Sequence, residues 1–154
     1  MRRSIPETCE HLRNHTERDR RLFWLEATSD EYLEKVYAAS TCLIAASYGE
    51  GFGLPLIEAA QHKLPIIARD IPVFREVAEN NAYFFNAETP SELAQAITDW
   101  LALYKADRHP ASDQLPWLTW KESATMLCDA IFKADTNMQR PITPTPSLPE
   151  VGQC

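Results

Sequence analysis

The residues best suited to chemistry lie in one short segment, EGFGLPLIE, where the carboxylates Glu50 and Glu58 enclose two glycines and a proline. With Gly49, which directly precedes the segment, Gly51 and Gly53 place three of the chain's four glycines within five residues. Glycine lets the backbone approach a ligand without a Cβ in the way. If a helix begins just after the glycines, its free first-turn N–H groups and its dipole favour an anion. The segment therefore predicts a phosphate-binding loop.

The two carboxylates narrow the kind of ligand. A carboxylate near a bound phosphate is electrostatically unfavourable unless it accepts hydrogen bonds from hydroxyl groups. Glu50 lies in the expected loop, and Glu58 lies one turn into the expected helix, where its side chain leans back toward the helix N-terminus. The pair indicates a ligand that carries both phosphate and several hydroxyls, such as a nucleotide sugar.

A strand and a helix must position this loop. Residues 41–46 form a short apolar run typical of a buried strand, and residues 54–62 are typical of a helix with Pro55 in its first turn. The other predicted strands are residues 22–25, 65–68 and 82–85. The other predicted helices are residues 4–18, 28–37, 72–76, 89–104 and 119–131. Because strands alternate with helices, the pattern favours an α/β fold with a parallel sheet.

The last predicted helix is expected to be buried along one face. The side chains of that face are Trp120, Ala124, Leu127, Cys128 and Ile131, which recur at helical spacing.

Composition excludes several classes of protein. The chain has 154 residues, enough for one domain with a sizeable core, and its 45% apolar and 24% charged residues are ordinary for a soluble globular protein. No apolar run is long enough to span a bilayer. The net charge of −7 argues against a nucleic-acid partner. The four cysteines and four histidines show no metal-ligand spacing, so no metal site is expected.

The glycine spacing, the proline and both glutamates together closely resemble the donor-binding motif of retaining GT-B glycosyltransferases of family 4, also called group 1. The likeness covers about residues 22–132. It includes the blocks SDEYL, YAAS, DIPVFREV and LTW, in the order of the family. The DIPVFREV block is most similar to bacterial mannosyltransferases of polysaccharide, lipopolysaccharide or O-antigen assembly. The spacing is not GxGxxG, so it does not favour a dinucleotide-dependent oxidoreductase.

The resemblance implies a role for each residue of the motif. Glu50 is implied to contact the donor sugar and, as the candidate catalytic residue, to help stabilise positive charge at the anomeric carbon. Glu58 is implied to accept hydrogen bonds from the ribose. The residues whose backbone amides would hold the sugar and diphosphate are Gly51, Phe52, Gly53 and Leu54. The residues implied to border the base are Leu25, Glu26 and Thr28.

The resemblance also implies a fold and a reaction. Residues 1–135 would form a partial, Rossmann-like donor-binding domain, the C-terminal domain of a GT-B enzyme truncated at its N-terminus. Residues 136–154, rich in proline, would form a disordered tail or linker. The reaction would be hexosyl, most simply mannosyl, transfer to a saccharide or lipid-linked acceptor held by a missing N-terminal domain. The implied donor is a nucleotide-diphospho-sugar such as GDP-mannose, with no further cofactor. The implied location is cytoplasmic, at most peripheral to the inner face of the membrane.

Several features depart from the family or leave alternatives open. Lys63 stands where the family has a glycine that closes the helix, and the family's phosphate-neutralising Arg and Lys would precede this chain. The isolated chain is therefore expected to be inactive. A four-stranded sheet is expected, in which strand 22–25 either pairs with strand 41–46 or is loosely held. Arg75 and Glu76 are interpreted as a surface pair. A non-catalytic binding module or relic, or a tight turn that binds nothing, remains an alternative.

Overall fold

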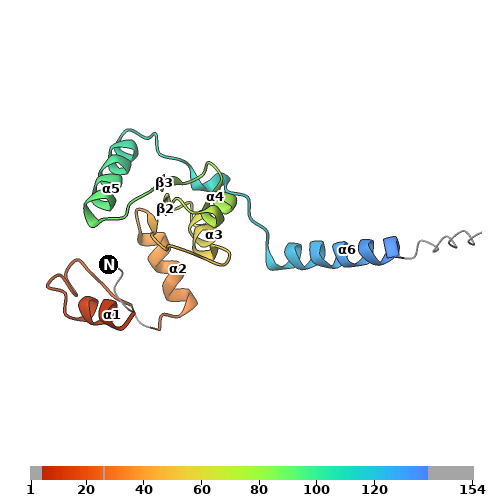
Figure 1. The fold of residues 1–154 in the computed structure, drawn as a ribbon, viewed down its shortest axis with the longest axis horizontal. Helices are drawn as coiled ribbons and strands as arrows, with labels where there is room; N and C mark the ends of the chain where they lie inside the picture. The colour runs from red at the N-terminus through yellow and green to blue at the C-terminus, as the bar shows by residue number, and fades with distance from the viewer. Residues whose placement is uncertain (1–4, 26, 139–154) are drawn as a thin grey trace, which may run out of the picture. The chain divides into compact units, whose positions relative to one another are not determined.

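The computed structural model describes residues 5–25 and 27–138, with side chains described for residues 7–25 and 27–133. The chain divides into two compact units, Met1–Leu115 and Pro116–Cys154. The first unit contains the sheet and most of the helices, and the second contains one long helix (Figure 1).

The first unit is built on a three-stranded parallel sheet. Its strands are β1 (Leu43–Ala45), β2 (Ile66–Arg69) and β3 (Tyr83–Phe85), in the order β1-β2-β3. In the register of the sheet, Leu43 lies opposite Ile66 on one side of β2, and Ile67 lies opposite Tyr83 on the other. All four residues of β2 are buried, as expected for a central strand. The predicted α/β fold with a parallel sheet is confirmed.

The helices follow the predicted order along the chain. They are α1 (Ile5–Arg13), α2 (Asp30–Ala39), α3 (Leu54–Gln61), α4 (Pro72–Ala78), α5 (Pro90–Lys105), the single 3₁₀ turn η1 (Ser112–Gln114) and α6 (Trp120–Met138). Local capping explains two of the starts. The Ser29 hydroxyl accepts a hydrogen bond from the N–H of Tyr32, and Thr89 and Glu92 form a complete capping box at α5.

The helices cover both faces of the sheet. Alternate residues of a strand point to opposite faces, so Ile66 and Ile67 belong to different core clusters. Ile66 packs with Leu56 of α3 and Phe74 of α4, whereas Ile67 packs with Trp100 of α5. Each of these five side chains is at most 1% exposed. The sheet is therefore held between α3 and α4 on one face and α5 on the other.

The predicted fourth strand, residues 22–25, is wrong. This segment forms no strand, and Phe23 is 63% exposed. Leu22 instead closes a local turn, in which its N–H donates to the Glu17 carbonyl and its own carbonyl accepts from the N–H of Asp19. These local hydrogen bonds use backbone groups that a strand would offer to a neighbour. Among the described residues, β1 therefore pairs with β2 only, and the sheet has three strands rather than the four expected.

The first helix is shorter than predicted. It ends at Arg13 rather than at residue 18, and turns follow it. The ring nitrogen Nδ1 of His15 accepts a hydrogen bond from the N–H of Glu17, which gives this backbone a partner outside a helix.

The last helix, α6, is expected to bury one face, and within the second unit this expectation is wrong. Trp120 is 85% exposed, and Leu127 and Ile131 are 62% and 53% exposed. Among the described residues of this unit, α6 is the one regular element, so its apolar side chains have no second described element of the unit to pack against. The helix continues to Met138, so residues 136–138 of the expected tail are helical, and residues 139–154 lie outside the described residues.

Lys63 does adopt the left-handed conformation, with φ +55°. The N–H of Leu64 bonds to the Ala59 carbonyl and the N–H of Lys63 bonds to the Ala60 carbonyl, which is the hydrogen-bond pattern of a Schellman cap closing α3. In this motif the left-handed residue is usually glycine.

We expect Lys63→Gly to stabilise the protein by about 0.5–1 kcal/mol, because relief of the left-handed strain exceeds the added freedom of the unfolded chain. Urea denaturation of the two proteins measures this difference. The matched control is Lys105→Gly in the last turn of α5, where glycine should destabilise by up to about 1 kcal/mol. Equal effects of the two substitutions would contradict the assignment of strain to Lys63.

Candidate functional site

The glycine loop joins the carboxyl end of β1 to the N-terminus of α3, as predicted. Gly53 is the N-cap of α3 and has φ +84°, a left-handed conformation that side chains rarely adopt. A Cβ at Gly53 would lie 3.3 Å from the buried ring of Phe74. Since glycine has no side-chain oxygen to cap the helix, the first-turn amides of α3 have no side-chain partner from residue 53.

Backbone conformation and packing do not explain why residues 49 and 51 are glycine. A Cβ at Gly49 or Gly51 would meet no atom within 4 Å, and neither residue has a left-handed φ. The fold therefore does not require glycine at these positions. Room above an exposed backbone is what a ligand approaching the loop needs. Phe52 is 61% exposed at the same loop.

The first glutamate of the motif is held by a neighbour. The hydroxyl of Ser47 donates to Oε1 of Glu50 at 2.7 Å, and Glu50 is exposed in the loop. The structure thus places this carboxylate on the solvent side of the glycine loop, with a second oxygen to offer a hydroxyl group.

The second glutamate lies on α3 and has a partner from another helix. The hydroxyl of Tyr37, on α2, donates to Oε2 of Glu58 at 2.9 Å. The ring of Tyr37 stacks on the imidazole of His62, with centroids 5.5 Å apart and planes at 14°. Burial, and next to it the hydrogen bond to Glu58, raise the pKa of Tyr37, so the hydroxyl remains a donor at neutral pH.

A buried arginine lies at the same edge of the sheet. Arg69 is 6% exposed and ends β2, the central strand. Its Nε donates to the carbonyl of Ala46 at 3.1 Å, and Nη1 donates to the carbonyl of Ala87 at 2.6 Å. Because Ala46 follows β1 and Ala87 follows β3, one guanidinium joins the carboxyl ends of all three strands. It also lies 3.9 Å from the centroid of the Tyr48 ring, in the first part of the glycine loop.

A second arginine makes a surface ion pair, but with a partner other than the one predicted. Arg75 binds Asp70 with two hydrogen bonds of 2.7 Å, rather than Glu76, because the side chain turns back over the Phe84 ring. The hydrogen bonds from Arg75 lower the pKa of Asp70. The pair lies just after β2 and reinforces the start of α4.

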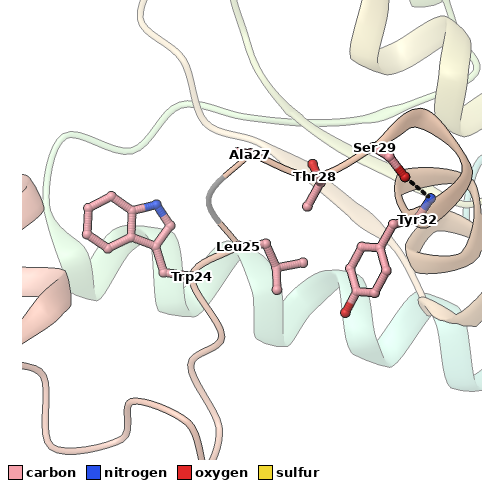
Figure 2. Close-up of a pocket in the computed structure, with 6 residues that line it drawn as sticks. All are labelled: Trp24, Leu25, Ala27, Thr28, Ser29 and Tyr32. Carbon is pink, nitrogen blue, oxygen red and sulfur yellow. Dashed lines mark hydrogen bonds between the residues drawn. The ribbon is translucent and has the colours of Figure 1, made fainter.

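Two of the three residues expected to border a base line a common pocket. Leu25 and Thr28 face an open hollow of about 440 Å³ before α2, and Figure 2 shows their side chains between the rings of Trp24 and Tyr32. Glu26 lies outside the described residues. Two aromatic rings beside an open hollow suit a flat ring such as a nucleobase. Helix α2 thus begins at this pocket and carries Tyr37, the partner of Glu58, further along.

In the described part of the chain, no three His, Cys, Asp or Glu side chains gather closely enough to bind a metal ion. Of the described helices, none is sufficiently long and apolar to cross a bilayer.

A match to a protein-family model identifies the family of this chain. The model of the family "Glycosyl transferases group 1" matches residues 6–113, which contain the whole glycine loop, both glutamates and all three strands. The chain belongs to this family. The resemblance read from the glycine motif is thereby confirmed.

Two known mannosyltransferases are similar to this chain over part of their length. The serotype-specific mannosyltransferase WbdA of Escherichia coli is 55% identical over 124 residues, which are 80% of this chain and 15% of WbdA. The O-antigen chain mannosyltransferase RfbU of Salmonella typhimurium is 38% identical over 74 residues, or 48% of this chain and 21% of RfbU. The chain therefore spans about 15–21% of the length of these relatives.

A solved structure gives the same fold. The sucrose-phosphate synthase of Thermosynechococcus elongatus matches with a TM-score of 0.60 at 23% identity, over 76% of this chain and 31% of that enzyme. At this identity the match concerns the fold, which is the GT-B arrangement expected for a group 1 glycosyltransferase.

Two residues that shape this glycosyltransferase loop were missed in the sequence. The role of Arg69 could have been predicted from the sequence, because a charged residue that ends an otherwise apolar strand has to find polar partners at the sheet edge. No feature of the sequence indicated the role of Tyr37, because an aromatic residue on an amphipathic helix is ordinarily a packing residue.

Proposed function

We propose that this chain binds a nucleotide-diphospho-hexose as the donor-binding part of a retaining glycosyltransferase. The observation that carries the proposal is the geometry of the glycine loop. Gly51 leaves open space above the backbone, and Gly53 starts α3 without a side-chain cap. The amides of residues 51–54 would hold the sugar and diphosphate. Glu50 would contact the sugar hydroxyls, and Glu58 would accept from the ribose.

The proposed reaction is transfer of mannose from GDP-mannose. WbdA, which is 55% identical over most of this chain, and RfbU are both named mannosyltransferases, and these names support mannose as the transferred sugar. The anomeric C–O bond to the diphosphate would break while the acceptor hydroxyl attacks from the same face and loses its proton to the leaving phosphate. Loop amides directed at the leaving diphosphate would stabilise its developing charge. Glu50 would help stabilise positive charge at the anomeric carbon. The step requires no metal or further cofactor.

The acceptor part is proposed to come from outside this chain. A saccharide or lipid-linked acceptor in polysaccharide or lipopolysaccharide synthesis fits the O-antigen name of RfbU. A cytoplasmic location, peripheral to the inner face of the membrane, would give access to such an acceptor. We propose that the isolated chain binds donor and transfers little or nothing.

A second candidate is a binding module without catalysis. It is favoured by Arg69, a buried cation at this edge, whose Nε and Nη1 already donate to two backbone carbonyls and so are not available to neutralise a leaving diphosphate. Because the isolated chain is expected to transfer little or nothing in either case, the test supplies the acceptor-binding part as a separate chain, together with donor and a mannose-terminated acceptor. Product formation supports the enzyme, whereas binding without product supports the module.

Isothermal titration of the purified chain with GDP-mannose, UDP-glucose, GDP and UDP tests the donor site. Saturable binding of one donor is expected, and Glu58→Ala should weaken it by about tenfold, the equivalent of one hydrogen bond to a charged group. Glu76→Ala, an exposed glutamate on α4, is the matched control and should bind as the unmodified chain does. Absence of binding by a chain that unfolds cooperatively would refute the proposal.

A further inference from the structure

The contact between Tyr37 on α2 and Glu58 on α3 joins two residues that are 21 positions apart in the sequence. Glu58 on α3 and His62, the C-cap residue of that helix, are four residues apart and so lie on the same side, one turn from each other. The ring of Tyr37 from α2 lies against this pair. Its face stacks on His62 while its hydroxyl reaches Oε2 of Glu58. Both ends of the tyrosine are therefore held, which fixes where the hydroxyl points.

This arrangement restricts the carboxylate of Glu58. A glutamate has three rotatable bonds and is costly to immobilise for binding. A donor fixed on Oε2 selects one rotamer before the ligand arrives and leaves Oε1 as the acceptor for a ligand hydroxyl. The raised pKa of Tyr37 keeps its hydroxyl protonated, and therefore able to donate, at neutral pH.

We propose that Tyr37 is a positioning residue that orients Glu58 toward the ribose hydroxyls of the donor nucleotide, and so sets the preference for a ribonucleotide. This inference rests on the proposed function, since it deepens the role of Glu58 there. Tyr37 acts through Glu58 and does not itself touch the nucleotide.

The test compares nucleotides with and without ribose hydroxyls. Titrations use GDP and UDP, each beside its 2′,3′-dideoxy counterpart, with the unmodified chain, Tyr37→Phe, Glu58→Ala and the double variant. The phenylalanine ring retains the stack on His62 and loses only the hydroxyl. Tyr104→Phe, on a ring that stacks on Trp100 in α5, is the matched control.

We expect the unmodified chain to bind the ribonucleotide about tenfold more tightly than the dideoxynucleotide. Tyr37→Phe should reduce this ratio about threefold to fivefold by weakening only ribonucleotide binding. In the Glu58→Ala background, Tyr37→Phe should change nothing further, because coupled residues are not additive. Tyr104→Phe should leave the ratio as it is.

Three outcomes would overturn the inference. In the first, Tyr37→Phe weakens both nucleotides equally, as expected of a tyrosine that only packs. In the second, the effects of Tyr37→Phe and Glu58→Ala simply add. In the third, Tyr37→Phe leaves the ratio unchanged. If the unmodified chain binds neither ribonucleotide, the proposed function itself fails. If the unmodified chain binds and one of the three outcomes above is seen, only the inference about Tyr37 fails, so the two failures are distinguishable.

Discussion

Replacement of Gly53 by alanine is expected to destabilise the first unit by about 2–3 kcal/mol. The left-handed backbone at φ +84° costs a residue with a Cβ about 1–2 kcal/mol. The new Cβ would also lie 3.3 and 3.4 Å from two ring atoms of Phe74, which is 1% exposed and has little space into which to move. Overpacking of this kind adds to the strain. Urea denaturation followed by circular dichroism measures the loss.

Gly51→Ala is the matched comparison in the same loop. Its Cβ would point into open space, so the free energy of unfolding should change by less than about 0.5 kcal/mol. Donor affinity should nevertheless fall by about tenfold, because the Cβ occupies the space through which the ligand approaches the backbone. Substitution of Gly53 thus mainly lowers the free energy of unfolding, whereas substitution of Gly51 mainly lowers donor affinity. Equal destabilisation by the two substitutions would contradict this assignment.

Arg69→Met should destabilise the fold by about 2 kcal/mol. Methionine fills a similar volume but cannot donate to the carbonyls of Ala46 and Ala87. Ala87 is 3% exposed, so its carbonyl would lose a charge-assisted hydrogen bond without water as a full replacement. Ala46 is exposed and water can replace the lost donor there. Because Ala46 begins the glycine loop, donor affinity should decline as well.

The control for this prediction is Arg75→Met. Arg75 has a side chain 49% exposed, and its ion pair with Asp70 lies at the surface, where such pairs contribute at most about 1 kcal/mol. The same chemical change is thus made at a buried and at an exposed arginine. Chemical denaturation should show the larger loss for Arg69→Met. Comparable losses would mean that the three strand ends do not depend on the guanidinium.

Much of the site could be predicted from sequence because its signals are local. A strand, a glycine loop and a helix start follow one another within about 20 residues, and Gly53 and Lys63 take the conformations that this order demands. The capping box of Thr89 and Glu92 is local in the same way, since all of its hydrogen bonds join residues within one turn.

The incorrect predictions concern features that depend on distant partners. Residues 22–25 have the apolar composition of a strand, but a strand exists only if a neighbour pairs with it, and local turn hydrogen bonds bind Leu22 instead. The apolar face of α6 is correctly read as a helix face. Whether a face such as that of Trp120 is buried depends on a second element, which the pattern of one helix does not contain.

The sequence alone determined the family, the α/β class and the loop that carries both glutamates, because spacing along the chain is enough to specify a turn and a helix start. Only the tertiary structure decided which groups hold that loop in place. Tyr37 reaches Glu58 across 21 residues, and Arg69 reaches Ala46 and Ala87 across 23 and 18 residues. Such contacts arise when packing brings separate elements together, and the chain must first lose the conformational entropy of closing those loops.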